Sequence, residues 1–347
     1  MHARAAALLA VLILTPAAAL FLTSAVALSA GAHAETLPLP GDAATGASQD
    51  SQIWQVSCPA AGDCVGVGAY HDASSTIPAV PTDQALIESE ANGVWSPSEI
   101  PDTSLPDYAS PPLPYLNTVA CTSVDNCVAA DAYDDANAYE QGLIDTEAAG
   151  VWTPMEAPLT NLSVYSGPSG PGAEVYLMAC PVADACVGAG TYVAGDASEH
   201  GLIETQSQSG WTASEAPAPP DSTVSSAPDF YDLSCAAARN CAAVGYYTDS
   251  SGNQQGLLES DRDGSWTAHA VDLSILVTAA DPQVWIYAVS CAAAGSCTAV
   301  GAYESGAGSY EPLAVSEVDG SWQPAVALSL PGDASTTADV SGDPIQN

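Results

Sequence analysis

Positive charge is what this sequence has least of. Its 347 residues include no lysine and only three arginines, against 41 acidic residues, which gives a formal net charge of −38 at pH 7. Binding to phosphate backbones needs clustered lysine or arginine side chains, and so does adsorption to anionic lipid. We therefore expect no nucleic-acid partner and no anionic membrane partner. Such a surface repels itself at neutral pH and suits an acidic or salty medium, or one with divalent cations.

Long apolar runs are also lacking, except at the amino terminus. Residues 1–34 begin with His2 and Arg4, continue through an apolar tract over residues 5–30, and end on Ala32-His33-Ala34. This pattern is typical of a secretory signal peptide. We expect cleavage after Ala34, a secreted, extracellular protein, and no membrane insertion of the mature chain. Because the tract is long for a signal peptide, an uncleaved amino-terminal anchor stays open as an alternative.

No cysteine stands outside a repeated C-x5-C pair. In an exported chain this arrangement favours one structural disulfide within each pair. Metal binding is the alternative, but the usual sites have shorter spacings and further histidine or cysteine ligands nearby. The predicted pairs are Cys58 with Cys64, Cys121 with Cys127, Cys180 with Cys186, Cys235 with Cys241, and Cys291 with Cys297.

Each cysteine pair belongs to a unit that occurs five times, with a period of 55 to 63 residues. An alternating hydrophobic run follows the second cysteine and ends on a tyrosine, and a tryptophan follows a glycine turn further along. In the first unit this predicts strands at residues 53–58, 64–70, 84–89 and 94–99. Four antiparallel strands per unit, with no helical period, predict an all-β fold, a five-bladed β-propeller with one local disulfide per blade.

We expect the propeller to occupy residues 52–330, between an amino-terminal segment at 35–51 and a flexible carboxy-terminal tail at 331–347. The two ends resemble each other, since residues 37–42 are Leu-Pro-Leu-Pro-Gly-Asp and residues 329–333 are Ser-Leu-Pro-Gly-Asp. The amino-terminal segment is therefore predicted either to close the ring as a strand or to lie loose. We expect a monomer.

Two turns carry a resemblance to a known group of repeats. Residues 260–266 are Ser-Asp-Arg-Asp-Gly-Ser-Trp and residues 316–322 are Ser-Glu-Val-Asp-Gly-Ser-Trp, with weaker forms at 89–95 and 146–152. They resemble the Asp-box, or BNR-type, repeats of secreted bacterial β-propellers, although the glycine stands closer to the tryptophan than in those repeats. The resemblance implies a turn between the third and fourth strands of each unit. Sialidases of this fold hold a substrate carboxylate with three arginines. The mature chain has two, so sialidase activity is not expected.

The candidate binding residues gather where the loops after the second strands meet the blade connections. Asp131 stands where the other four units have glycine, and Asn117 stands where they have an aromatic residue. Together with Asp134 and Asp135 they predict a polar pocket or a calcium site, with sequence drift on a solvated loop as the alternative. The aromatic candidates for sugar stacking are Trp54, Tyr115 and Trp285.

No catalytic residue is predicted, because the five units share no catalytic group and no serine lies in a nucleophile elbow. The main hypothesis is a secreted, non-enzymatic binding module that recognises a glycan or another surface component. No cofactor is expected apart from calcium. Two alternatives stay open. One is a carbohydrate-active hydrolase with paired carboxylates, and the other is a structural envelope protein.

Overall fold

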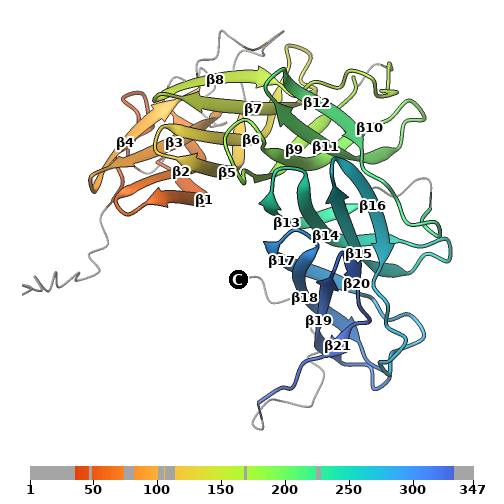
Figure 1. Cartoon of the computed structure of the whole chain (residues 1–347). Coiled ribbons are helices and arrows are strands. Elements are labelled where there is room, and N and C mark those ends of the chain that lie inside the picture. Colours follow the sequence, from red (N-terminus) through yellow and green to blue (C-terminus); the bar gives the residue numbers. More distant parts are fainter. Residues whose placement is uncertain are drawn as a thin grey trace, which may run out of the picture. The chain divides into compact units, whose positions relative to one another are not determined.

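The computed structural model describes residues 36–46, 49–73, 82–100, 105, 114–167, 170–223 and 228–331. The predicted signal peptide and all of the predicted tail beyond residue 331 lie outside these ranges. The named elements are 21 strands, arranged in five sheets in which consecutive strands lie side by side (Figure 1). In these ranges no helix has the length and the apolar composition needed to cross a membrane.

Every sheet is antiparallel and is formed by one repeat unit, which we call a blade. The first blade consists of β1 (Ser51–Ala60), β2 (Asp63–Asp72), β3 (Thr82–Ala91) and β4 (Val94–Glu99). The second consists of β5 (Tyr115–Ser123), β6 (Asn126–Asp134), β7 (Glu140–Ala148) and β8 (Val151–Glu156). The third consists of β9 (Ala173–Ala179), β10 (Val187–Val193), β11 (Glu199–Ser207) and β12 (Gly210–Glu215).

The last two blades follow the same order. The fourth consists of β13 (Asp229–Ala237), β14 (Asn240–Thr248), β15 (Gln254–Arg262) and β16 (Ser265–Ala270). The fifth consists of β17 (Trp285–Ala293), β18 (Ser296–Glu304), β19 (Tyr310–Val318), β20 (Ser321–Trp322) and β21 (Val326–Ala327). Both β20 and β21 pair with β19, so together they take the place of a fourth strand. The prediction of a five-bladed β-propeller with four antiparallel strands per blade is confirmed.

All five predicted disulfides are present, each near the turn between the first two strands of its blade. Among the described residues no cysteine is free. In the fourth blade the two cysteines face each other directly across the hairpin, at positions 235 and 241. The C-x5-C spacing therefore reflects a tight β-hairpin whose two strands are tied near the turn.

The tyrosine that ends each repeat run has a common structural role. Its ring is 1 to 2% exposed in all five blades. Each hydroxyl group donates a hydrogen bond to a carboxylate nearer the surface, as Tyr70 does to Asp42 and Tyr247 does to Asp221. The other pairs are Tyr133 with Glu156, Tyr192 with Glu215, and Tyr303 with Glu311. A buried hydroxyl group needs such a partner, which explains why tyrosine rather than phenylalanine repeats at this position.

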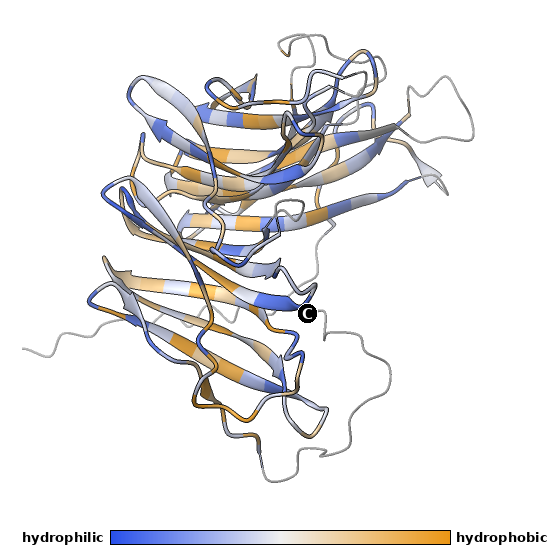
Figure 2. Cartoon of the chain, turned by 90° about the vertical axis from the view of Figure 1, so that its right-hand side faces the viewer, coloured by the Kyte–Doolittle hydropathy of each residue, from blue (hydrophilic) through white to orange (hydrophobic). Residues whose placement is uncertain are grey.

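The hydrophobic core lies between successive blades, in layers that we call seams. In the seam between the first two blades, Val65 and Val67 of β2 pack against Leu116 and Val119 of β5. A bulge in β5 between Leu116 and Thr118 brings both apolar residues to the face that meets the preceding blade. Figure 2 shows the hydrophobic stretches along the strands and hydrophilic residues at many loop ends. Both faces of an internal blade are thus buried against its neighbours.

The amino-terminal segment runs along the first blade. Ala43 pairs with Asp72 at the end of β2. The connections between blades make the same kind of isolated bridge on the following blades, at Val164 with Ala194, Ser222 with Asp249, and Thr278 with Ser305. Residues 42–44 therefore occupy, on the first blade, the place that a connection from a preceding blade occupies on the third, fourth and fifth.

Candidate functional site

Asp131 is the residue that departs most clearly from the repeat. At Gly68, Gly190, Gly245 and Gly301 an added Cβ would lie 1.8 to 2.0 Å from a carbonyl oxygen of the adjacent first strand. Glycine is therefore required there by close backbone approach. The second blade instead accommodates a whole carboxylate side chain at this position, and Asp131 is only 5% exposed. Its cross-strand partners Leu116 and Leu143 belong to the seam between the first and second blades, so the substitution places an acid on that face of the second blade.

Two further carboxylates approach Asp131. Glu140 is exposed at the start of β7, and Glu174 is half-buried near the start of β9 in the next blade. Burial raises the pKa of Asp131 to about 7, and the negative charges of Glu174 and Glu140 add to the increase. Burial and then Glu174 likewise raise the pKa of Glu140 to about 7, and the two carboxyl groups are hydrogen-bonded.

The same arrangement recurs one seam further along. Glu199 at the start of β11 occupies the position of Glu140, and Asp229 at the start of β13 occupies the position of Glu174. Burial raises the pKa of Asp229, with a contribution from Glu199 and an opposing hydrogen bond from the hydroxyl group of Tyr246. Two successive seams therefore each present a pair of carboxylates at the same end of the strands.

Aromatic rings continue this edge into the fourth and fifth blades. Tyr231 of β13 and Tyr287 of β17 stand at the bulges of their strands, and their rings stack at 5.7 Å with an interplanar angle of 21°. Tyr246 lies tilted against Tyr231 at 5.7 Å, and Trp285 lies tilted against Tyr310 at 5.3 Å. Tyr231, Tyr287 and Tyr310 are each about two-fifths to one-half exposed, so they form an accessible apolar surface.

The acids and the rings form one continuous feature, which we call the acid–aromatic row. Its carboxylates are Asp131, Glu140, Glu174, Glu199 and Asp229, and its rings are Tyr176, Tyr231, Tyr246, Trp285, Tyr287 and Tyr310. The hydroxyl group of Tyr176 lies within the electrostatic reach of Asp229, Glu174 and Glu199, and that of Tyr231 lies within reach of Asp229 and Tyr287. Burial raises the pKa of Tyr287, and the neighbouring Tyr310 adds to the increase. The row crosses from the second blade to the fifth.

The structure brings some of the predicted binding residues into this row. Asp131 lies within it, Asp134 pairs with Glu140 across β6 and β7, and Trp285 belongs to its aromatic part. Burial and the neighbouring Asp135 raise the pKa of Asp134. The carboxylate of Asp135 itself accepts hydrogen bonds from the backbone N–H groups of Asn137 and Tyr139, at 2.8 and 3.0 Å, and so organises its loop.

The other predicted residues lie on the first strands of the first two blades. Trp54 is 42% exposed and its indole N–H donates to the side-chain oxygen of Gln52 at 3.3 Å. Asn117 is exposed at the equivalent bulge, and Tyr115 is half-buried at the start of β5. These three residues share the strand position of the aromatic part of the row but make none of its ring contacts that join the fourth and fifth blades.

Several residues of the row were not predicted as binding residues. Glu140 and Glu199 are 59 positions apart, and Glu174 and Asp229 are 55 apart, which matches the cysteine period. That spacing was the available signal for the two acid pairs. The stacking of Tyr231 on Tyr287 had no such signal, because it depends on how one blade packs against the next.

Two further kinds of functional group are metal ligands and arginine side chains. In the part of the chain that the structure describes, no three histidine, cysteine or acidic side chains are grouped to hold a metal ion. The calcium site around Asp131, Asp134 and Asp135 stays a prediction. Arg262 pairs with Glu317 at 2.9 Å, and Arg239 donates to the carbonyl oxygen of Asp263. Arg239 therefore contacts the turn between β15 and β16, and Arg262 joins the end of β15 to β19 of the fifth blade.

Comparisons with known proteins show only distant likenesses. No protein-family model matches the sequence, and no curated protein matches it. A Hadza microbial sialidase shares 12% identity at a TM-score of 0.42, with 80% of this chain and 58% of that chain covered. A Penicillium chrysogenum alpha-L-arabinanase complexed with arabinobiose shares 12% identity at a TM-score of 0.41, with 79% of each chain covered. AofleA from Arthrobotrys oligospora shares 11% identity at a TM-score of 0.37, with 82% and 76% covered.

Proposed function

We propose that this protein is a secreted β-propeller that binds a glycan through the acid–aromatic row. The observation that carries the proposal is the exposed stack of Tyr231 on Tyr287 directly beside Asp229. Flat aromatic rings pack against the apolar faces of sugar rings, and few but well-placed polar groups then fix the orientation of a ligand. Ionised carboxylates are pure acceptors, so they match the many hydroxyl donors of a sugar.

The charge of the row narrows the class of glycan. Five carboxylates line it, and the described residues place no basic side chain among them. An anionic sugar such as a uronic or sialic acid would meet like charges at close range, which is unfavourable. The ligand that fits is a neutral or amino-bearing oligosaccharide, long enough to contact both the rings and the acids.

The test is binding of purified, oxidised protein to an array of neutral, amino-bearing and acidic oligosaccharides, followed by calorimetry on the glycans retained. Removing the stack with Tyr231→Ala or Tyr287→Ala should weaken binding at least about tenfold. Trp95→Ala is the matched control, because Trp95 is a half-exposed ring on the outer strand β4. Binding that is unchanged in both tyrosine variants, or a preference for acidic glycans, would contradict the proposal.

A second candidate function is glycoside hydrolysis, and the neighbouring carboxyl groups of Glu140 and Glu174 favour it. A carboxyl group with a pKa near 7 can donate a proton to a leaving group at neutral pH, while a second carboxylate stays ionised. Release of reducing sugar from the bound glycans would identify such an enzyme. Glu140→Gln and Glu174→Gln should then abolish release and retain binding. Absence of product from every bound glycan leaves binding as the function.

A further inference from the structure

Within the part of the chain that the structure describes, the first blade presents an apolar face that has no neighbouring blade. At the position of Leu116 in β5, the four later blades carry apolar side chains that are 0 to 2% exposed, whereas Ile53 in β1 is 37% exposed. At the position of Val119 the four later blades are 3 to 8% exposed, whereas Val56 is 54% exposed. These two positions pack against the preceding blade in every internal seam. The first blade carries the same chemistry, and no described residue packs against it as a preceding blade does in the internal seams.

The fifth blade exposes apolar side chains on its other face, the face that meets the following blade in the internal seams. The position of Val244 in β14 is fully buried in the first four blades, whereas Val300 in β18 is 40% exposed. The position of Val271, just after the fourth strand, is 1 to 7% exposed in the first four blades, whereas Leu328 is 44% exposed. Both positions pack against the following blade in the internal seams.

These faces do not cover each other within the described chain. Packing between strands of different blades joins each blade to the next in chain order, and no comparable packing joins β1 to β4 with β17 to β21. We propose that the two faces are the halves of one interface, and that the first blade of a second copy of this chain docks on the fifth blade, head to tail.

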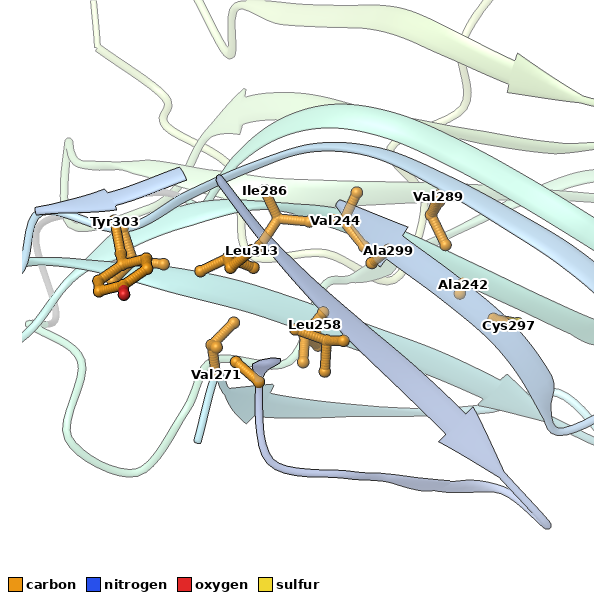
Figure 3. Packing of buried hydrophobic residues seen from close by; sticks show 13 residues of the cluster. Ala242, Val244, Leu258, Val271, Ile286, Val289, Cys297, Ala299, Tyr303 and Leu313 are labelled. Atoms are coloured by element: carbon orange, nitrogen blue, oxygen red, sulfur yellow. The ribbon is translucent and has the colours of Figure 1, made fainter. Parts of the chain in front are cut away.

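The internal seam between the fourth and fifth blades shows what such an interface contains. Val244, Leu258 and Val271 of the fourth blade lie against residues of the fifth that include Ile286 and Val289 (Figure 3). The proposed interface repeats this composition closely, with Val300 and Leu328 on one side and Ile53 and Val56 on the other. Well-packed apolar faces of this kind exclude water and favour association.

One polar contact of the internal seams can also form. The hydroxyl group of Ser57 accepts a hydrogen bond from the backbone N–H of Cys121 at 3.0 Å, and that of Ser234 accepts one from Cys291 at 3.1 Å. Ser290 occupies the same position in the fifth blade and is exposed. Its partner in a second copy is the backbone N–H of Cys58, at the position that Cys121 and Cys291 hold in the internal seams.

The first blade is also ready to receive a neighbour without rearrangement. Ala43 already pairs with Asp72 as Thr278 pairs with Ser305, so the place of an incoming connection is filled by the chain's own amino-terminal segment. Because the interface joins two different faces, each pair leaves one free face at either end. Assembly therefore continues until a ring closes, or grows as a filament.

Sedimentation of the full oxidised chain tests the proposal. Wild type should form species larger than a dimer as concentration rises. Salt at about 1 M should strengthen association because it screens the repulsion between two strongly acidic copies. Val56→Asp and Val300→Asp should each give monomers, since each blocks one face. An equimolar mixture of the two variants should form a dimer and nothing larger, because one intact interface remains. Val94→Asp, at a side chain that is 65% exposed on β4, is the control and should associate like wild type.

Intact disulfides and an unchanged β-sheet circular dichroism spectrum establish that each variant is folded. A wild type that is monomeric at every concentration and salt would overturn the proposal. Hydrogen exchange of that monomer shows the reason, because protection of the first strand of blade one would mean that the chain covers its own faces. Dimers in both single variants would overturn the head-to-tail arrangement.

Discussion

Two groups of carboxylates in this protein have raised pKa values, and they lie in very different surroundings. The first group lies in the middle of the third strands of the first four blades and consists of Glu88, Asp145, Glu204 and Glu259, which are fully buried. The second consists of Asp131, Glu140 and Asp229 in the acid–aromatic row, where the side chains range from buried Asp131 to exposed Glu140. Burial alone raises the pKa of Glu88 to about 7 and of Glu204 to about 8. In the row, repulsion between neighbours adds to burial.

The two groups of carboxylates therefore have different roles: the first belongs to the interior of the fold, and the second belongs to the proposed binding surface. No hydrogen-bond partner reaches either carboxyl oxygen of Glu88, Glu204 or Glu259. The backbone N–H groups of Thr153 and Thr146 face Asp145 and oppose part of the effect of burial, which nevertheless raises its pKa to about 7. The interior groups therefore hold protons that stay inside the fold. The row carries its charge where a ligand can meet it.

The largest expected effect concerns pH and stability. A raised folded-state pKa means that the native state holds protons that the unfolded state releases. The unfolding free energy should therefore increase as pH falls from about 8 to about 4.5 and level off below that. Each unit of raised pKa corresponds to about 1.4 kcal/mol at most, so several buried groups together should dominate the profile.

Urea unfolding of the oxidised protein at pH 8, 7, 6 and 5 measures this. The midpoint should rise at each step towards acid. Because buried charges are screened less, 1 M salt should change the contribution of the interior group to this rise less than the contribution of the row. A midpoint that falls between pH 7 and pH 5 would show that hydrogen-bonded or paired carboxylates outweigh the buried ones.

The next largest effect is a change in stability when one carboxylate of the interior group is replaced. The fifth blade carries Val315 where the fourth carries Glu259, whose pKa burial raises well above its ordinary value. Glu259→Val should stabilise the protein at pH 8 by roughly 1 to 4 kcal/mol, since it removes an unpartnered buried polar group. The gain should shrink at pH 5. The reverse change, Val315→Glu, should destabilise at pH 8, and exposed Asp50→Asn should change little. A gain of equal size at both pH values would point to packing rather than ionisation.

A smaller effect is expected for a substitution in the acid–aromatic row. Glu140→Gln removes one of the negative charges that raise the pKa of Asp131. The pKa of Asp131 should fall from about 7, while burial keeps it above its ordinary value. The unfolding free energy should change by less than about 1 kcal/mol, because Glu140 is exposed. Titration of the Asp131 carboxyl carbon by NMR measures the shift. Glu259→Val is the control and should leave that pKa unchanged.

The sequence predicted the fold better than the site, for a physical reason. Disulfides, turns and closing tyrosines depend on residues close together in the chain, so a repeated C-x5-C pair and a repeated tyrosine specify them locally. Alternation along Leu86, Ile87 and Glu88 was uninformative about burial, because blades pack on both faces and even the glutamate is enclosed. Glu140 and Glu174 meet only through the packing of one blade on the next. Asp131 was found because its departure from glycine is visible in the repeat itself.

The smallest expected effect concerns Asp249, a carboxylate whose pKa is lowered rather than raised. Asp249, in the loop after β14, accepts hydrogen bonds from the backbone N–H groups of Ser251 and Asn253 at 2.8 and 3.0 Å. These bonds lower its pKa below the ordinary 3.8. Stability from this group is present above pH 3.8 and is lost as pH falls through the lowered value. Asp249→Ser, which copies Ser305 of the fifth blade, should therefore cost about 1 kcal/mol at pH 7. The cost should be smaller near pH 2, and Asp249→Asn should retain part of the contacts at both. Urea midpoints of the three proteins at the two pH values measure this, and an equal loss at both would show that the ionised form has no special role in the loop.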